Sequence, residues 1–251
     1  MSDKSIEKLR YDNYAANTDA LSGVANIAPY LRPPYEKYFE IIEGKVGEGS
    51  RVLELACGVG HVSPRFDEGH CEYFGIDISH TSLMKARQLC EAEGGHCDRV
   101  YVSMDIEGLA LKDESFDTVI CAGGLSYGDN QLVLSEIYRV LKVGGWLVLV
   151  DSLNDNPIYR INRYMHYIRG NRSLSTLQRM PDLRLINEYR AKFMGQSEVA
   201  FFGGAVWLLS PLTSLLGSKA VGWLVNQVDR LFKIRSSAFK FVLACEKIVY
   251  E

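Results

Sequence analysis

Short apolar segments alternate with segments of helical periodicity between residues 50 and 151, and this alternation constrains the fold more than any other feature. Between two of the apolar segments, Leu134, Ile137 and Tyr138 recur at the spacing of one helix face. Strands that are apolar on both faces and separated by helices indicate a parallel sheet covered on both sides. The apolar segments are residues 51–55, 72–76, 100–103, 116–121 and 146–150.

The second half of the chain extends this pattern. Residues 156–192 are predicted to be helical, and residues 198–202 and 239–248 are predicted to be two further strands. We therefore expect a single α/β domain: a Rossmann-like, seven-stranded, mostly parallel sheet with helices on both faces and a C-terminal helical cap. The expected parts are an N-terminal helical lid at 1–49, a cofactor-binding core at 50–151 and an acceptor-binding half at 152–251.

The first predicted strand runs into a glycine-rich turn. Gly58 and Gly60 would let a ligand approach the backbone closely. Ser63 stands where the dinucleotide fingerprint requires a third glycine, so this turn does not indicate a pyrophosphate site. Asp77 ends the second strand, where a carboxylate can accept hydrogen bonds from both hydroxyls of a ribose. Asp105 follows the third strand, where a short acid can meet an adenine amino group.

In this order the motifs resemble those of the class I methyltransferases that depend on S-adenosyl-L-methionine (SAM), over about residues 50 to 151. The resemblance implies SAM as the cofactor and an enzyme that transfers the methyl group of SAM to an acceptor. It also implies that residues between Tyr11 and Tyr35 close over SAM. The implied contacts are Glu54, Gly58, Gly60 and backbone groups near Cys121 for the methionine part, Asp77 for the ribose, and Ile78, Asp105 and Ile106 for the adenine.

A rival interpretation comes from the short-chain dehydrogenases. Tyr138 and Lys142 have the spacing of the catalytic pair in that family. The glycine turn, however, lies late in the chain and is incomplete, and Tyr138 belongs to an apolar helix face. Core packing therefore explains Tyr138 better than an NAD-dependent reaction does.

An alcohol acceptor benefits from a general base near the end of the fourth or fifth strand. We expect His166 to be the base, since its unperturbed pKa of about 6.5 suits the role, with Tyr127 as a second candidate. The alternative is that His166 lies on the solvated side of a helix whose apolar face carries Ile158, Ile161, Met165 and Ile168. Asp129, Asp151 and Asn154 were the other candidates at these strand ends.

The acceptor itself is indicated only by weaker patterns. Arg160, Arg163, Arg169 and Arg172 either clamp a phosphate or carboxylate or form a charged helix surface. Residues 28–35, 162–164, 179–181 and 238–241 resemble a bacterial methyltransferase subgroup that accompanies surface-polysaccharide biosynthesis. That resemblance implies O-methylation of a sugar or glycan intermediate. A small lipophilic acceptor such as a quinone or phenol, and a SAM-binding module without turnover, stay open as alternatives.

Residues 199–228 form the most apolar stretch of the chain. Pro211 and Gly217 interrupt this stretch, so we expect no transmembrane segment. The favoured interpretation is a helical cap packed on the sheet and lining the acceptor pocket, or a homodimer interface. Peripheral contact with a membrane stays open, although the stretch lacks the basic polar face of a membrane-surface helix.

Composition excludes some classes of function. The net charge of −3 argues against a nucleic-acid-binding surface. None of the six cysteines has CxxC spacing, so we expect reduced thiols in a cytoplasmic protein. No metal site is predicted, because His61, His70, His80 and His96 have no convincing partners.

Overall fold

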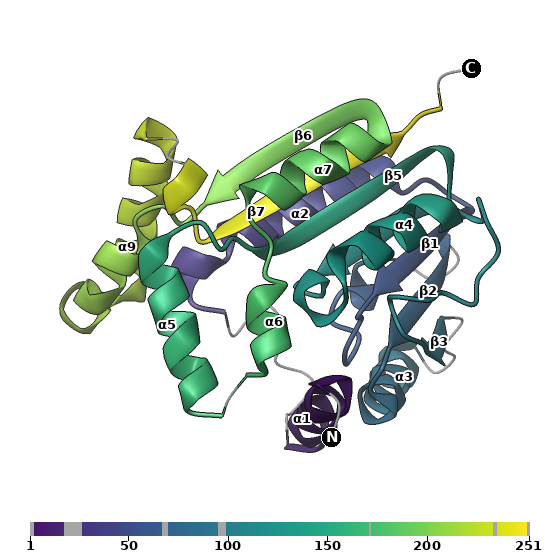
Figure 1. The fold of residues 1–251 in the computed structure, drawn as a ribbon, viewed down its shortest axis with the longest axis horizontal. Helices are drawn as coiled ribbons and strands as arrows, with labels where there is room; N and C mark the ends of the chain where they lie inside the picture. Colours follow the sequence, from purple (N-terminus) through teal and green to yellow (C-terminus); the bar gives the residue numbers. More distant parts are fainter. Residues whose placement is uncertain are drawn as a thin grey trace.

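The sheet has the predicted architecture. The computed structural model describes residues 3–17, 27–66, 70–94, 99–170, 172–232 and 235–249. Within them, seven strands form one sheet in the order β3-β2-β1-β4-β5-β7-β6 (Figure 1). Neighbouring strands pair in parallel except at β7, which runs antiparallel to both β5 and β6. The expectation of a seven-stranded, mostly parallel α/β sheet is therefore confirmed.

The strand bounds differ from the predicted ones at two places. β5 begins at Leu141 instead of residue 146, because Leu141 is fully buried and pairs with Phe116 before a register shift. β6 begins at Met194, whose left-handed φ of 62° turns the chain directly from the preceding helix into the strand. The strands are β1 Ser50–Leu55, β2 Cys71–Asp77, β3 Val100–Ser103, β4 Phe116–Ala122, β5 Leu141–Ser152, β6 Met194–Phe202 and β7 Lys240–Lys247.

Helices cover both faces of the sheet, as the sequence pattern predicts. Helices α2 (Pro33–Lys45) and α3 (His80–Gly94) pack on the face that carries Val52, Ile120 and Val148. Helices α4 (Asn130–Val140) and α7 (Leu183–Phe193) pack on the face that carries residues such as Leu53, Val119 and Leu147. Because side chains alternate along a strand, neighbouring residues of β1 serve opposite layers.

Helix α1 (Asp3–Asn17) precedes these layers and packs against α3. Of its described side chains, only Glu7 and Ala15 are buried. A short 3-10 turn, η3 (Pro29–Leu31), leads into α2. Part of the expected lid, residues 18–26, lies outside the described residues.

The apolar stretch does not form the predicted cap on the sheet. Helix α8 (Val206–Leu209), the turn η6 (Ser210–Leu212) and helix α9 (Thr213–Leu231) lie at one end of the molecule. Val221 and Val225 of α9 are buried, but Leu215 is 80% exposed. The correction has a physical reason: α9 packs on the small turn η3, which covers only a narrow stripe of the helix.

The same stretch passes a simple test for a membrane span. Among the described helices, one segment, Val206–Leu231, is long and apolar enough to cross a membrane by length and composition. Gly217 interrupts it with a non-helical backbone (φ 78°, ψ 154°), as the sequence indicated. Two further helices, α5 (Pro157–Ile168) and α6 (Leu174–Gln178), lie between β5 and α7.

The cysteines depart from the expectation of six reduced thiols. Cys57, Cys71, Cys121 and Cys245 are free. Cys90 is disulfide-bonded. The expectation is therefore wrong at Cys90. Disulfides are rare in cytosolic proteins, so this bond does not support the expected cytoplasmic location. That location stays a prediction.

Candidate functional site

A cavity of about 140 Å³ lies at the carboxyl ends of β1, β2, β3 and β4. The strand order reverses between β1 and β4, which is where open parallel sheets bind ligands. Six of the predicted site residues meet there. The lining residues are Lys4, Glu7 and Tyr11 of α1, Ala56 and Gly58 after β1, Asp77 and Ile78 at the end of β2, Met104, Asp105 and Ile106 after β3, and Ala122, Gly123 and Tyr127 after β4.

The two glycines of the turn have different roles. Gly58 has a φ of 55°, and a Cβ at this position would meet nothing within 4 Å, so its backbone is open to a ligand. Gly60 has a φ of 80°, but a Cβ there would lie 2.9 Å from the Cβ of Ala86 in α3. Gly60 therefore allows close helix packing, and it is not among the residues that line the cavity.

Asp77 joins the glycine turn to the end of β2. Its carboxylate accepts hydrogen bonds from the backbone N–H of Gly58 (2.9 Å) and of Ser79 (2.8 Å). The side chain is 8% exposed, and burial raises its pKa, although the two backbone N–H groups oppose the shift. Asp77 thus holds the turn in place and still presents an acceptor to the cavity.

Glu54 does not reach the cavity. It lies on the α2 and α3 face of β1 and is 2% exposed, and its carboxyl group accepts a hydrogen bond from the Tyr73 hydroxyl. Burial raises the pKa of Glu54 to about 8, against the lowering effect of Tyr73. The implied contact of Glu54 with the methionine part of SAM stays a prediction.

Cys121 points away from the cavity as well. Its thiol is buried in the core beneath α4 and α7, and burial raises its pKa. The next two residues, Ala122 and Gly123, line the cavity. The backbone that follows Cys121 is therefore the part of this motif that faces a ligand.

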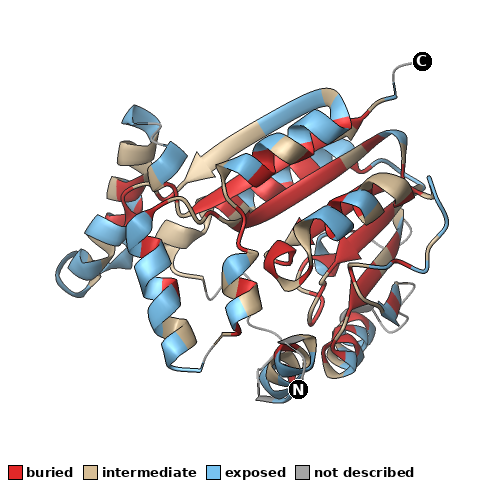
Figure 2. Ribbon diagram, in the orientation of Figure 1, coloured by how far each residue is buried: buried red, intermediate tan, exposed pale blue. Residues whose placement is uncertain are grey.

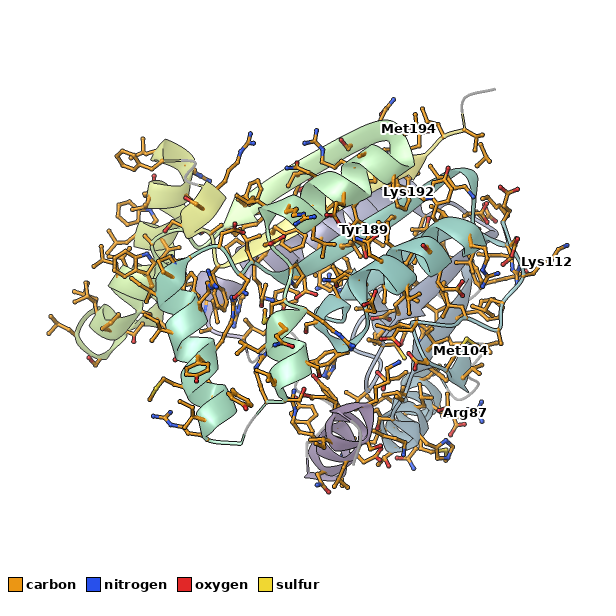
Figure 3. The ribbon with its side chains drawn as sticks, viewed as in Figure 1. Arg87, Met104, Lys112, Tyr189, Lys192 and Met194 are labelled. Atoms are coloured by element: carbon orange, nitrogen blue, oxygen red, sulfur yellow. The ribbon has the colours of Figure 1, made fainter. Side chains whose placement is uncertain are left out.

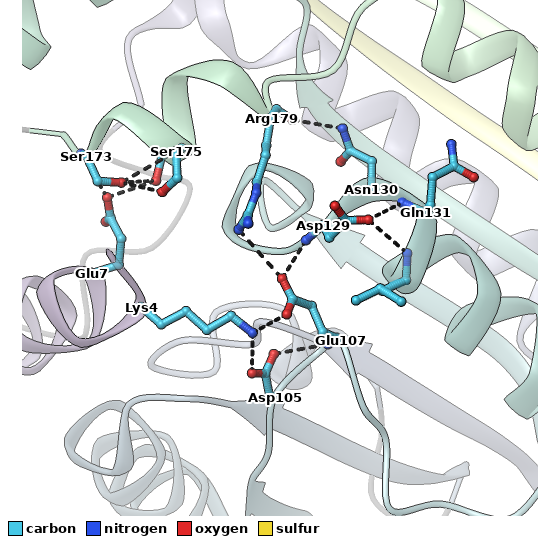
Figure 4. A network of polar contacts seen from close by, with 12 residues as sticks. Lys4, Glu7, Asp105, Glu107, Asp129, Asn130, Gln131, Ser173, Ser175 and Arg179 are labelled. Carbon is cyan, nitrogen blue, oxygen red and sulfur yellow. Dashed lines mark hydrogen bonds and ion pairs between the residues drawn. The ribbon is translucent and has the colours of Figure 1, made fainter. Parts of the chain in front are cut away.

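A charged network closes the end of the cavity near Asp105. Lys4 forms ion pairs with Asp105 and with Glu107 (Figure 4). Oε1 of Glu107 also accepts a hydrogen bond from the N–H of Asp129 at 2.6 Å, and Nη1 of Arg179 lies 3.6 Å from the same oxygen. Burial raises the pKa of Asp105, but the hydrogen bond and charge of Lys4 outweigh it and lower the pKa.

Hydroxyl groups of Tyr11 and Tyr127 form a second group of polar contacts at the cavity wall. The hydroxyls of Tyr11 and Tyr127 are hydrogen-bonded, and their rings meet edge to face with centroids 5.3 Å apart. Arg10 donates to both hydroxyls, at 3.1 Å to Tyr11 and 3.4 Å to Tyr127. Burial, with the neighbouring Tyr127, raises the pKa of Tyr11.

Helix α1 therefore forms one wall of the cavity through polar contacts. Besides Lys4 and Tyr11, Asp12 accepts a hydrogen bond from the Ser79 hydroxyl at 2.6 Å. Glu7 accepts from the Thr176 hydroxyl of α6 at 2.9 Å. The sequence analysis missed Lys4 and Glu7, although residues 4, 7 and 11 share one helix face at i, i+3 and i+7 spacing.

The residues present fit an adenosyl cofactor. An open glycine backbone, a nearly buried carboxylate and apolar Ile78 and Ile106 surround one cavity, as ribose and adenine require. The volume of about 140 Å³ is below the roughly 300 Å³ at which ligand pockets begin. Since only Glu7 and Ala15 of the described α1 side chains are buried, an outward shift of α1 is the least costly way to enlarge the cavity.

Of the two predicted general bases, Tyr127 lines the cavity and His166 does not. Tyr127 lines the cavity from the turn η5 (Leu125–Tyr127). His166 is half-buried in the last turn of α5 and is not among the cavity-lining residues, so its role as base stays a prediction. Asp129 caps α4 by accepting from Gln131 and Leu132 N–H groups, which gives it a structural role.

Buried charges lie beside the site at the end of β5. Asp151 accepts a hydrogen bond from the N–H of Leu125 at 3.1 Å and so holds η5 in place. Burial raises the pKa of Asp151, against the charge of Lys240. Arg163 donates to the Leu153 carbonyl at 2.7 Å and to Asn154 at 3.0 Å, and burial lowers its pKa to about 10.

Arg163 thereby corrects the prediction for α5. The sequence pattern predicted that Arg163 joins Arg160, Arg169 and Arg172 in a clamp for an anion or in a charged helix surface. In the structure Arg163 is buried, whereas Arg160 and Arg169 are exposed. The four arginines therefore do not form a single clamp.

Two further features of the described residues lie apart from this cavity. A groove of about 610 Å³ runs along α7 and β6 and contains none of the predicted site residues. Tyr138 and Lys142 do not form a catalytic pair, because the Tyr138 ring packs on Phe193 and Lys142 pairs with Asp117 at 2.8 Å. No group of three potential metal ligands occurs in the part of the chain that the structure describes.

Comparisons with known proteins bear on the fold and the cofactor. Residues 53–149 match the model of a methyltransferase domain family. The phosphatidylethanolamine N-methyltransferase of Cereibacter sphaeroides is 36% identical over 104 residues, or 41% of this chain and 51% of that protein. The ubiquinone/menaquinone biosynthesis C-methyltransferase UbiE of Coxiella burnetii is 27% identical over 157 residues, or 59% of this chain and 61% of that protein. The chain thus spans between half and two thirds of the length of these relatives.

Among solved structures, phosphoethanolamine N-methyltransferase 2 of Haemonchus contortus in complex with SAM has the same fold. It superposes with a TM-score of 0.60 at 17% identity, over 95% of this chain and 60% of that chain.

Proposed function

We propose that this chain, whose residues 53–149 form a class I SAM-dependent methyltransferase domain, transfers a methyl group from SAM to a small acceptor. One observation carries the proposal: the residues of four separate motifs converge on one cavity at the switch point of the sheet. Gly58, Asp77 and Asp105 follow three different strands and meet at one cavity. A purely structural role for each residue would not require them to meet.

The residues of the chain hold and enclose the cofactor in this proposal. The Gly58 backbone takes the methionine part, Asp77 accepts from the ribose hydroxyls, and Ile78 and Ile106 flank the adenine. Bound SAM supplies an electrophilic methyl group that is already activated. The protein then needs to align the acceptor and keep water out, which α1 does by covering the cavity.

Tyr127 is the residue best placed to take a proton from a hydroxyl acceptor. Its hydroxyl lies at the cavity and contacts Tyr11. Asp151 acts as a positioning residue, because it anchors η5 through the N–H of Leu125. We expect Tyr127→Phe to lower kcat by about 10²–10⁴ for a hydroxyl acceptor, the range typical of a lost general base. Under the earlier hypothesis His166→Ala would lower kcat instead.

For the acceptor, we propose a small lipophilic molecule of the quinone or phenol kind. The name of one relative, a ubiquinone/menaquinone biosynthesis C-methyltransferase, supports a quinone, and the name of a second, a phosphatidylethanolamine N-methyltransferase, supports a lipophilic acceptor over a sugar. The largely exposed apolar helices α5 and α9 support it too. O-methylation of a glycan intermediate, which the weaker resemblance implied, stays a prediction without a supporting contact. Placement in the cytoplasm is likewise a proposal.

Calorimetric titration of the protein with SAM, S-adenosylhomocysteine and NAD tests the cofactor. We expect binding of the two adenosyl ligands and no heat with NAD; binding of NAD alone would overturn the proposal. Methyl transfer is then measured on a panel of phenolic, quinone and sugar acceptors, with Arg184→Gln on the outer surface of α7 as a control variant. Binding of SAM without transfer to any acceptor would favour the non-catalytic SAM-binding module.

A further inference from the structure

Helix α5 is packed with its apolar face outward. Ile158, Ile161, Met165 and Ile168 follow one stripe of the helix, and each is exposed, Ile161 by 65%. The residues that face the protein are Tyr159 and Arg163. Soluble helices normally bury the apolar stripe. An amphipathic helix turned this way requires a partner that covers the stripe.

Helix α9 presents the same feature from a distant part of the sequence. Its inward side carries Val221, Gly222 and Val225, which pack near η3. Its outward side carries Leu215 and Trp223, which are 80% and 62% exposed. Large aromatic and branched side chains at such exposure are costly in water.

The two helices belong to one end of the molecule. Tyr159 of α5 shares a buried cluster with Val206 of α8 and with Val221 and Val225 of α9. Figure 1 shows α5 and α9 at the end opposite to β3, and Figure 2 shows both mostly in the colour of exposed residues. We call the exposed side chains of α5, α8, η6 and α9 the α5–α9 surface. Its apolar members are Ile158, Ile161, Tyr164, Met165, Ile168, Leu208, Leu212, Leu215, Leu216, Trp223 and Leu231.

The exposed charges on the α5–α9 surface are basic, and Asp229 of α9 is half-buried and accepts hydrogen bonds from the N–H groups of Gly203 and Gly204. Residues 156–181 contain five arginines and no acidic residue, and residues 199–228 contain Lys219 as their sole charge. Arg160, Arg169 and Lys219 are exposed. In a chain of net charge −3, this end therefore combines apolar side chains with positive charge. Residues 199–228 alone lack the basic polar face of a membrane-surface helix, and α5 adds Arg160 and Arg169 to this end of the molecule.

Two other partners fit this combination less well. A symmetric dimer would place the same basic patch against itself, which like charges oppose. A membrane span is opposed by the break at Gly217, which leaves only about 14 continuous helical residues, or about 21 Å, where about 30 Å is needed.

We propose that the α5–α9 surface docks on a bilayer that contains anionic phospholipid, with the helices lying in the interface. Apolar side chains insert among the acyl chains, and Arg160, Arg169 and Lys219 meet the phosphate groups. Trp223 and Tyr164 suit the boundary between headgroups and acyl chains. This docking stands independently of the proposed methyl transfer.

Cosedimentation of the full chain with vesicles tests the docking. One set of vesicles contains phosphatidylcholine alone, and a second contains about one third phosphatidylglycerol. We expect binding to the second set at low salt, with affinity that falls as salt rises. Two double variants separate the contributions: Ile161→Asn with Leu215→Asn, and Arg169→Gln with Lys219→Gln. Each should weaken binding to anionic vesicles by about tenfold or more.

Matched controls lie elsewhere on the surface. Arg87→Gln with Lys112→Gln removes two charges at the far end of the molecule (Figure 3), and Met84→Asn with Leu132→Asn removes two exposed apolar side chains. Both should bind vesicles as the wild type does. Circular dichroism and S-adenosylhomocysteine binding confirm that every variant folds.

Four outcomes would overturn the proposal. The first is no binding to anionic vesicles at low salt, and the second is equal binding by all variants. The third is a stable dimer of the wild type that is lost in the double variant of Ile161 and Leu215. The fourth is protein that stays on the vesicles after an alkaline carbonate wash. The third would make the surface a self-interface, and the fourth would make Val206–Leu231 a span.

Discussion

The carboxylate of Asp77 serves both the fold and the cavity. It accepts hydrogen bonds from the N–H groups of Gly58 and Ser79, and Asp77 also lines the cavity. A substitution of Asp77 therefore lowers ligand affinity in two ways: it removes a contact with the ligand, and it removes the hydrogen bond that holds Gly58 in the glycine turn. Two variants of different size separate these effects.

We expect Asp77→Asn to weaken S-adenosylhomocysteine binding by about 10- to 100-fold, because a charged hydrogen-bond acceptor contributes about 1.5–3 kcal/mol. Asp77→Ala should weaken it further, since the turn also loses its anchor. Calorimetry measures both, and Asp113→Asn on the exposed surface serves as the control. Unchanged affinity in both Asp77 variants would remove Asp77 from the ribose site.

Glu54 should make stability depend on pH. Its pKa is about 8 in the folded protein against an ordinary value of 4.5, so between these values the folded state holds a proton that the unfolded state has lost. The free energy of unfolding should therefore fall as pH rises from about 4.5 to 8, by at most about 4–5 kcal/mol.

Denaturant unfolding of the wild type and Glu54→Gln checks this expectation. The two proteins should have similar stability near about pH 5, and Glu54→Gln should become the more stable one near about pH 8.5. A constant difference across this range would show that Glu54 does not titrate as its burial indicates.

At residue scale, sequence reasoning located Asp77 and Asp105 because strand ends meet at one edge of a parallel sheet. It could not place Glu54, whose position one residue before Leu55 directs it to the α2 and α3 layer. The motif identifies the residues that lie near the glycine turn. Side chains alternate between the two faces of a strand, and this alternation determines which of those residues point toward the cavity.

At the scale of elements, α1 is the part of the site held by the least apolar packing. Its contacts with the rest of the protein include the ion pairs of Lys4, the hydroxyl of Tyr11 and the hydrogen bonds of Asp12 to Ser79 and of Glu7 to Thr176. A helix of this kind opens at lower free energy than a core helix. The sequence predicted a lid in this region but not the residues that fasten it, because those contacts join residues about a hundred positions apart.

We expect amide hydrogen exchange in α1 to slow at least several-fold when S-adenosylhomocysteine binds, because the ligand adds contacts between α1 and the strand ends. Lys4→Ala should speed α1 exchange in the absence of ligand. Helix α2, whose Tyr38 and Ile42 are fully buried, provides the internal reference and should not change. Equal protection of α1 with and without ligand would contradict its role as a lid.

Periodicity predicted α5 as an amphipathic helix but not its orientation. The stripe from Ile158 to Ile168 is visible in the sequence, yet the buried side is the one with Tyr159 and Arg163. Arg163 is kept there by the Leu153 carbonyl and Asn154, which lie beyond the reach of a local pattern. Orientation depends on such tertiary partners.

For the molecule as a whole, ligand binding should raise the thermal stability of the entire sheet. With S-adenosylhomocysteine at about 100 times its Kd, the gain is about 2.7 kcal/mol, which corresponds to a Tm increase of about 5–10 °C for a chain of this size. Calorimetric scanning should show one transition that moves with ligand concentration. NAD at the same concentration should leave the Tm unchanged, and an equal rise with NAD would contradict the cofactor assignment.

The position of β7 between β5 and β6 governs the order in which this sheet can be completed during synthesis. β7 pairs with both neighbours along its length, but it emerges from the ribosome after them. Until residues 240–247 are available, the edge of β5 stays open and β6 has no partner strand. A nascent chain therefore carries an unpaired, aggregation-prone edge from the completion of β5 at Ser152 until β7 has emerged.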